Sequence, residues 1–97
     1  MLIAIGSARA RQGRREDLVS AAREMAAATR GDDGCVSYGF YADLDDPETV
    51  VSVEVWRDQQ SLDAHMTHGH TDRFLGVTLE LVDGAPSMSM HHVVDPA

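Results

Sequence analysis

The feature that most constrains this chain is the alternation in residues 49–56, TVVSVEVW. Val51, Val53 and Val55 occupy every second position, and Ser52, Glu54 and Trp56 alternate with them. Period-two alternation over this length indicates a β-strand whose two faces meet different surroundings. The chain therefore contains a sheet, and a tryptophan on the non-valine face predicts that this face is also shielded from water.

Three further segments have the composition of strands. Residues 35–42 (CVSYGFYA) place Val36, Tyr38 and Phe40 on one face, and the acidic, proline-containing segment 43–48 reads as a turn. Two short strands joined by such a turn predict an antiparallel hairpin. The other expected strands are residues 2–10 and 86–94.

Two regions have helical periodicity. Apolar residues on one face predict a helix over residues 15–30: Leu18, Ala21, Ala22, Met25 and Ala28. A second helix is expected after Asp58, which is a good N-cap, with a core stripe of Leu62, His65 and Met66. Gly69 interrupts that helix. We expect it to restart at Thr71 or Asp72 and to continue the stripe through Phe74, Leu75, Thr78, Leu79 and Val82.

The predicted order is β-α-β-β-α-β, which is the ferredoxin-like α+β arrangement of a four-stranded antiparallel sheet with two helices on one face. Ninety-seven residues suffice for one domain, so residues 1–97 form a single unit. Because the helices cover only one face, we expect a second copy to cover the other and to form a dimeric α+β barrel.

Composition excludes several classes of partner. The formal net charge of −8 argues against nucleic acid and anionic membranes, both of which require a basic face. The apolar runs are far shorter than the roughly 20 residues of a membrane-spanning helix, and we expect a cytoplasmic protein. Lysine is absent, which removes Schiff-base chemistry, and one cysteine cannot form an internal disulfide or a multi-cysteine metal site.

Several motifs together resemble the antibiotic biosynthesis monooxygenase family, in particular its quinol-monooxygenase-like members. The segments that carry the resemblance are Gly34-Cys35-Val36-Ser37-Tyr38, Asp45-Asp46-Pro47, Glu54-Val55-Trp56-Arg57-Asp58, Leu62-Asp63-Ala64-His65-Met66, and His70 with Phe74. Ser61-Leu62 stands where the family has Ala-Leu, and three residues separate His70 from Phe74, which form an adjacent His-Phe pair in the family.

The resemblance implies a small cytoplasmic homodimer with a pocket between helices and sheet. It implies an oxidoreductase, a monooxygenase that uses no cofactor and that combines dioxygen with a small aromatic hydroquinone- or anthrone-type substrate. The haem-degrading and anthrone-oxidising branches each use an asparagine that this chain lacks. The alternatives are an isomerase on the same fold and a non-catalytic dimer that binds small molecules.

Cofactor-free oxygenation requires a substrate that supplies the electrons and a base that deprotonates it. His65 is the candidate catalytic base because its helical spacing directs it toward the sheet, although a structural histidine bonded to a backbone carbonyl has the same pattern. We expect His68 to be exposed and His70 either to line the pocket or to cap a helix. No metal is expected, because these histidines do not share a helical face and no carboxylate motif stands beside them.

The remaining candidates would bind substrate or fill the core. Trp56 could line the pocket, but its position opposite Val55 favours the dimer interface. Tyr38 could donate a hydrogen bond to a substrate oxygen or belong to the core. The other candidate substrate-binding residues are Met66, Phe74, Met90 and His92.

Overall fold

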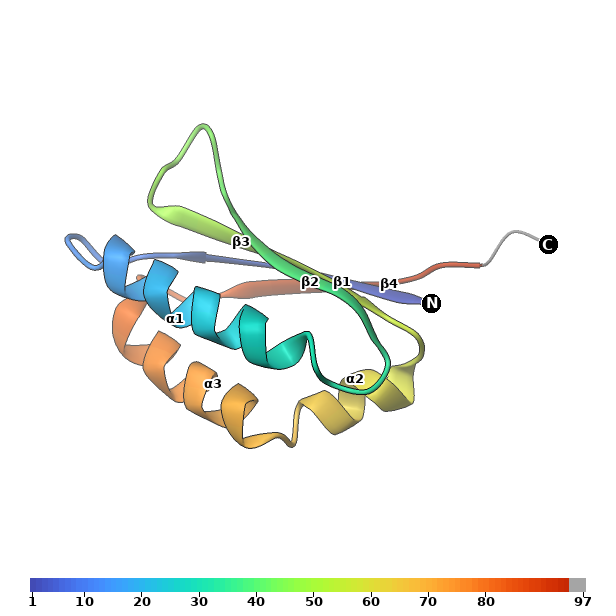
Figure 1. The fold of residues 1–97 in the computed structure, drawn as a ribbon. Coiled ribbons are helices and arrows are strands. Elements are labelled where there is room, and N and C mark those ends of the chain that lie inside the picture. Colours follow the sequence, from blue (N-terminus) through green and yellow to red (C-terminus); the bar gives the residue numbers. More distant parts are fainter. Residues whose placement is uncertain (95–97) are drawn as a thin grey trace.

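A computed structural model describes residues 1–94 of the chain. The described elements are β1 (Leu2–Arg9), α1 (Arg15–Thr29), β2 (Cys35–Ala42), β3 (Thr49–Trp56), α2 (Gln59–His65), α3 (Gly69–Leu81) and β4 (Ser87–His92). The strands form one antiparallel sheet in the order β2-β3-β1-β4, and the helices lie together on one side of it (Figure 1). The predicted ferredoxin-like fold is confirmed.

The helical region after Asp58 contains two helices rather than one interrupted helix. Asp58 caps α2 as predicted, because its carboxylate accepts a hydrogen bond from the backbone N–H of Ser61 at 2.8 Å. The bend occupies residues 66–68, and α3 begins at Gly69 instead of Thr71 or Asp72. Thr71 stabilises the bend because its hydroxyl donates to the His65 carbonyl oxygen at 2.8 Å. The order is therefore β-α-β-β-α-α-β.

The start of β2 departs from the predicted pattern. A register shift between Cys35 and Ser37 places an extra residue in the strand, and such a bulge changes the face on which the next side chain lies. Cys35 packs against the core, whereas Val36 is 58% exposed. The prediction that Val36 shares a face with Tyr38 and Phe40 is wrong for this reason.

The two faces of β3 have the opposite environments to those predicted. Ser52, Glu54 and Trp56 lie on the buried face under the helices, and Trp56 is 0% exposed. Val51, Val53 and Val55 lie on the other face, which no element of residues 1–94 covers, and each is only half-buried. The prediction that Trp56 anchors a dimer interface is therefore wrong, because the helices of its own subunit cover it.

Two apolar clusters lie between the helices and the sheet. One surrounds Trp56, and its other buried members are Leu2, Met25, Ala26, Tyr38 and Leu62. The second lies near the other end of the sheet and consists of Ala10, Leu18, Val50, Leu81 and Val82. Phe40 packs against both clusters and so connects them.

Gly34 determines how the chain enters β2. Its φ of 81° lies in the left-handed region that side chains disfavour, and a Cβ at this position would collide with the Ser61 side chain on α2. Glycine thus allows the turn after α1 to approach α2.

Among residues 1–94, no helix combines the length and the apolarity that crossing a membrane requires.

Candidate functional site

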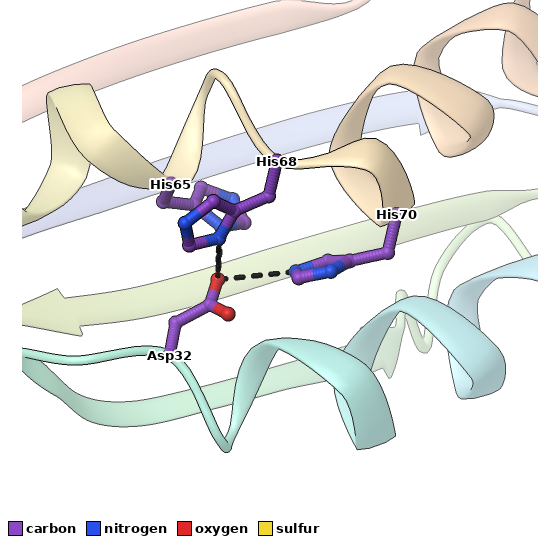
Figure 2. Close-up of side chains that lie close together, drawn as sticks. All are labelled: Asp32, His65, His68 and His70. Atoms are coloured by element: carbon purple, nitrogen blue, oxygen red, sulfur yellow. Dashed lines mark hydrogen bonds and ion pairs between the residues drawn. The ribbon is translucent and has the colours of Figure 1, made fainter.

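Three histidines and one aspartate meet at the bend between α2 and α3 (Figure 2). We call Asp32, His65, His68 and His70 the histidine–aspartate cluster. Asp32 Oδ2 lies 2.8 Å from His65 Nδ1, 3.1 Å from His68 Nδ1 and 3.1 Å from His70 Nε2. All four ligand-type atoms lie within 4.8 Å of one another. Asp32 was not predicted as a site residue, and it supplies the carboxylate that is absent from the sequence neighbourhood of the histidines.

Separate elements bring these side chains together. His65 is the last residue of α2, His68 is the N-cap residue of α3, and His70 lies in the first turn of α3. Asp32 belongs to the turn that follows α1, where its backbone N–H donates to the Thr29 carbonyl oxygen at 2.9 Å. Because the bend turns three imidazoles toward one point, residues that do not share a helical face still converge. His68 forms no side-chain capping bond, so its ring remains free for the cluster.

The cluster is shielded from water. The side chains of His65 and Asp32 are 2% and 8% exposed, whereas those of His70 and His68 are 20% and 39% exposed. Burial opposes ionisation of Asp32, but the imidazoles outweigh it and lower the pKa of this carboxyl below its ordinary value. Asp32 is thus an anion at neutral pH, and the cluster provides one negative charge among three imidazole rings.

One polar atom of the cluster has no hydrogen bond. His68 Nδ1 is buried and lies 3.1 Å from Asp32 Oδ2, but the direction of approach does not make a hydrogen bond. Buried polar atoms normally find a partner. The cluster therefore has unused binding capacity at a nitrogen that is directed toward the carboxylate.

His65 also contacts aromatic residues of the sheet. Its ring centroid lies 4.7 Å from that of Trp56 and 5.8 Å from that of Tyr38. The Trp56 indole N–H in turn donates to Glu54 Oε1 at 3.0 Å. A continuous group of polar and aromatic side chains thus connects the cluster to the buried face of β3.

Glu54 is the second acidic residue that the sequence analysis missed. Burial raises the pKa of its carboxyl, while the Trp56 N–H and the nearby His65 act in the opposite direction. Burial, together with Glu54 and other negative groups, also raises the pKa of Tyr38, which therefore stays a neutral hydroxyl. The alternation of β3 could have indicated that Glu54 is buried, since Glu54 shares a face with Trp56. In the structure, every second residue from Val50 to Trp56 is buried.

A pocket of about 110 Å³ lies between the helices and the sheet, and we call it the inter-layer pocket. Ser52 and Thr78 contribute hydroxyls, and Phe40 and Phe74 contribute aromatic rings. Its other lining residues are Gly6, Ser7, Ala8, Leu18, Ala22, Val50, Leu75, Pro86, Ser87 and Met88. This is the pocket between layers that the sequence predicted, and Phe74 is the one candidate residue that lines it.

The other candidate residues lie elsewhere. Met66 is 51% exposed on the bend, so its expected place in the core stripe is wrong. Met90 and His92 share the helix-side face of β4 as the alternation predicted, but both side chains are exposed on this edge strand. His65 and Trp56 line none of the pockets named here. His70 and Phe74 both line a groove of about 190 Å³ between α1 and α3.

A hollow larger than the two already described lies away from these groups. It measures about 340 Å³ and runs between α1 and β2, where Arg15, Arg23 and Arg30 line it together with Phe40 and Tyr41. No acidic or histidine side chain lines this groove. It therefore offers cations and aromatic surface but no group that could accept a proton from a substrate.

The fold and the buried polar group define a small α+β protein with a pocket between its two layers. The sequence model of the antibiotic biosynthesis monooxygenase family matches residues 1–76. The chain therefore belongs to the antibiotic biosynthesis monooxygenase family.

Relatives of this chain share its fold at low sequence identity. Rv0793 from Mycobacterium tuberculosis is 26% identical, with a TM-score of 0.91 and coverage of 99% of this chain and 97% of that chain. PA3566 from Pseudomonas aeruginosa is also 26% identical, with a TM-score of 0.88 and coverage of 97% and 94%. The uncharacterized protein sll1783 from Synechocystis sp. is 20% identical over 94 residues, which are 97% of this chain but only 64% of the length of that protein.

Proposed function

We propose that this protein is a cofactor-independent monooxygenase that oxidises a small hydroquinone-type ring in the inter-layer pocket. The observation that carries this proposal is the pocket itself: a mainly apolar space to which four residues contribute hydroxyls, Ser7, Ser52, Thr78 and Ser87, in a chain that belongs to a monooxygenase family. A cavity of about 150 Å³ with apolar walls holds one benzene molecule. The volume of about 110 Å³ is smaller than this, so the pocket excludes a fused polycyclic substrate, and a single hydroquinone ring would bind with part of the ring outside the pocket or with small shifts of its walls.

The reaction needs no external reductant because the substrate supplies the electrons. Loss of a hydroxyl proton gives an electron-rich anion, which transfers an electron to dioxygen. The two radicals then combine to form a peroxide on a ring carbon. Loss of water from the peroxide leaves a hydroxyquinone, so that one hydroquinone and one dioxygen give one hydroxyquinone and one water. An apolar pocket protects these intermediates from side reactions.

Glu54 is the proposed base. It lies on the same face of β3 as Ser52, which lines the pocket, and its raised pKa brings the carboxyl toward the neutral range in which a general base works best. The Ser52 hydroxyl would hold the substrate oxygen, and Glu54, which does not itself line the pocket, would take its proton through one water. His65 supports Trp56 and thereby the position of Glu54, so we assign His65 a positioning role instead of the predicted catalytic one.

A second copy of the chain completes the proposed enzyme. The uncovered sheet face carries Ile3, Ile5, Val51, Val53 and Val55, and Ile5 is 40% exposed. An apolar sheet face of this kind is stable in water when another layer covers it. We propose a homodimer that pairs these faces and that works in the cytoplasm.

Oxygen uptake with a panel of substituted hydroquinones tests the function. Gly6→Ala is the decisive variant, because the new Cβ would lie 2.7 Å from Ser52 Oγ and 3.2 Å from Met88 Cε at the pocket wall. We expect KM to rise at least tenfold. Gly76→Ala is the matched control, since a Cβ there meets no atom within 4 Å and α3 tolerates alanine. No uptake above the uncatalysed rate with any hydroquinone would contradict the proposal.

The alternatives give different results in the same experiments. An isomerase would exchange a solvent proton into its substrate without consuming oxygen. A binding protein would lose affinity in Gly6→Ala but would turn over nothing. The Glu54→Gln variant further distinguishes an oxygenase from a binding protein. We expect this variant to reduce kcat at least a hundredfold if the protein is an oxygenase, and to change only ligand affinity if it is a binding protein.

A further inference from the structure

We infer that the histidine–aspartate cluster binds a divalent transition-metal ion, with zinc as the best match. This site lies outside the inter-layer pocket, and it goes beyond the proposed oxygenase function, with which it shares only His65. The ligands would be Asp32 Oδ2, His65 Nδ1, His68 Nδ1 and His70 Nε2.

The three imidazole nitrogens already lie around the fourth donor, Asp32 Oδ2. Zinc binds imidazole nitrogen and carboxylate oxygen at about 2.0–2.2 Å, so that tetrahedral ligand atoms lie about 3.3 Å from one another. The three distances from Asp32 Oδ2 to the imidazole nitrogens are 2.8, 3.1 and 3.1 Å. Small rotations that spread the four side chains would therefore admit an ion at their centre (Figure 2).

The poorly aligned nitrogen of His68 adds to this indication. Three rings compete for one carboxylate oxygen, and His68 Nδ1 is buried beside it without a hydrogen bond. A metal ion would bond to this nitrogen and to the other three ligands at once. Imidazole and carboxylate ligands suit zinc, and four protein ligands fill its tetrahedral shell.

A filled shell indicates a structural ion. Catalytic zinc sites keep a position for water or substrate, whereas structural sites are closed by four protein ligands. Here the ligands come from the turn after α1 and from the bend between α2 and α3. The ion would fasten these two segments together and would hold His65 against Trp56.

Zinc titration of the chelator-treated full chain tests this inference. We expect one zinc ion per chain by calorimetry and by metal analysis after dialysis, and an increase of several degrees in Tm. Bound Co²⁺ would have the visible spectrum of a tetrahedral site. None of these measurements involves oxygenase activity, so the outcome does not depend on whether the proposed function is correct.

His68→Gln and His70→Gln are the informative variants, because both side chains are partly exposed and their loss leaves the core intact. Each should weaken zinc binding at least tenfold and abolish the increase in Tm. His91→Gln is the matched control, since His91 is exposed on β4 and bonds only to Ser89 at 3.0 Å. Equal zinc affinity in the parent chain, His68→Gln and His70→Gln would overturn the inference, as would a loss of binding in His91→Gln alone.

Discussion

The two faces of the sheet differ in a way that hydrophobicity alone would not suggest. The face under the helices carries Ser52 and Glu54 beside Trp56, whereas the uncovered face carries Val51, Val53 and Val55. The more polar face of β3 is therefore the one buried within the subunit. Polar side chains were placed where burial is costly, which is typical of positions selected for a functional site.

The comparison also explains the uncovered face. A contiguous group of partly exposed valine and isoleucine side chains is typical of a surface that another layer covers. The proposed function thus assigns chemistry to the covered face and assembly to the uncovered face. Substitutions on the two faces should therefore have different consequences. Three predictions examine this difference, and a fourth concerns the bend between α2 and α3.

The largest effect on stability should come from Trp56→Ala. Removal of a fully buried tryptophan costs about 3–5 kcal/mol, and here it also leaves the Glu54 carboxylate without its N–H donor. Urea unfolding measures this loss. Leu79→Ala on the exposed face of α3 is the control and should change the free energy of unfolding by less than about 0.5 kcal/mol. Similar losses in the two variants would refute the assignment of the covered face.

Val53→Asp should convert the proposed dimer into monomers. An aspartate in the centre of the uncovered face would leave a charge without a partner in the interface, and the proposed association should weaken at least a hundredfold. Light scattering at micromolar concentration measures the mass. Leu79→Asp introduces the same charge on a helix and should leave the dimer intact. A monomeric parent chain would show that the apolar face has another function.

Glu54→Gln should stabilise the protein at neutral pH while it removes activity. Burial raises the pKa of Glu54 above the unfolded value of about 4.3, so the ionised carboxylate destabilises the fold at pH 7. That cost decreases as the pH falls through the folded pKa, and it disappears below the unfolded value. The stability advantage of Glu54→Gln should therefore shrink between pH 7 and pH 4. An advantage that stayed constant or grew on acidification would contradict the raised pKa.

The smallest effect is expected at Met66. The helical pattern predicted a core position, but the side chain is half-exposed on the bend, so Met66→Ala should cost less than about 1 kcal/mol. Leu62→Ala, one turn earlier and buried, should cost about 2–5 kcal/mol. Chemical denaturation of both variants checks the difference. Equal losses of unfolding free energy in the two variants would show that Met66 packs in the core.

Local patterns predicted the elements well. The bounds of β2 and β3 agree with the alternation of residues 35–42 and 49–56, and Asp58 caps α2 as its side chain allows. These features depend on neighbouring residues, which the sequence displays directly. The division into α2 and α3 was only partly visible, because Gly69 suggested an interruption but the bend forms just before it.

The candidate site was predicted less well. His65, His68 and His70 were recognised, but their meeting with Asp32 was not, because 33 residues separate Asp32 from His65. No local periodicity relates the turn after α1 to the bend after α2. Glu54 was overlooked for a different reason. The alternation of its strand was recognised, but the face that carries Glu54 and Trp56 was predicted to meet a second copy of the chain instead of the helices.

The sequence by itself determined the strands, the helical segments and the family, since backbone preferences and side-chain alternation act over a few residues. It also determined that the two faces of β3 differ. Only the tertiary structure decided which face the helices cover, because alternation is the same whichever side they pack on. Packing of the α1–β2 turn against the α2–α3 bend likewise decided that one carboxylate meets three imidazoles.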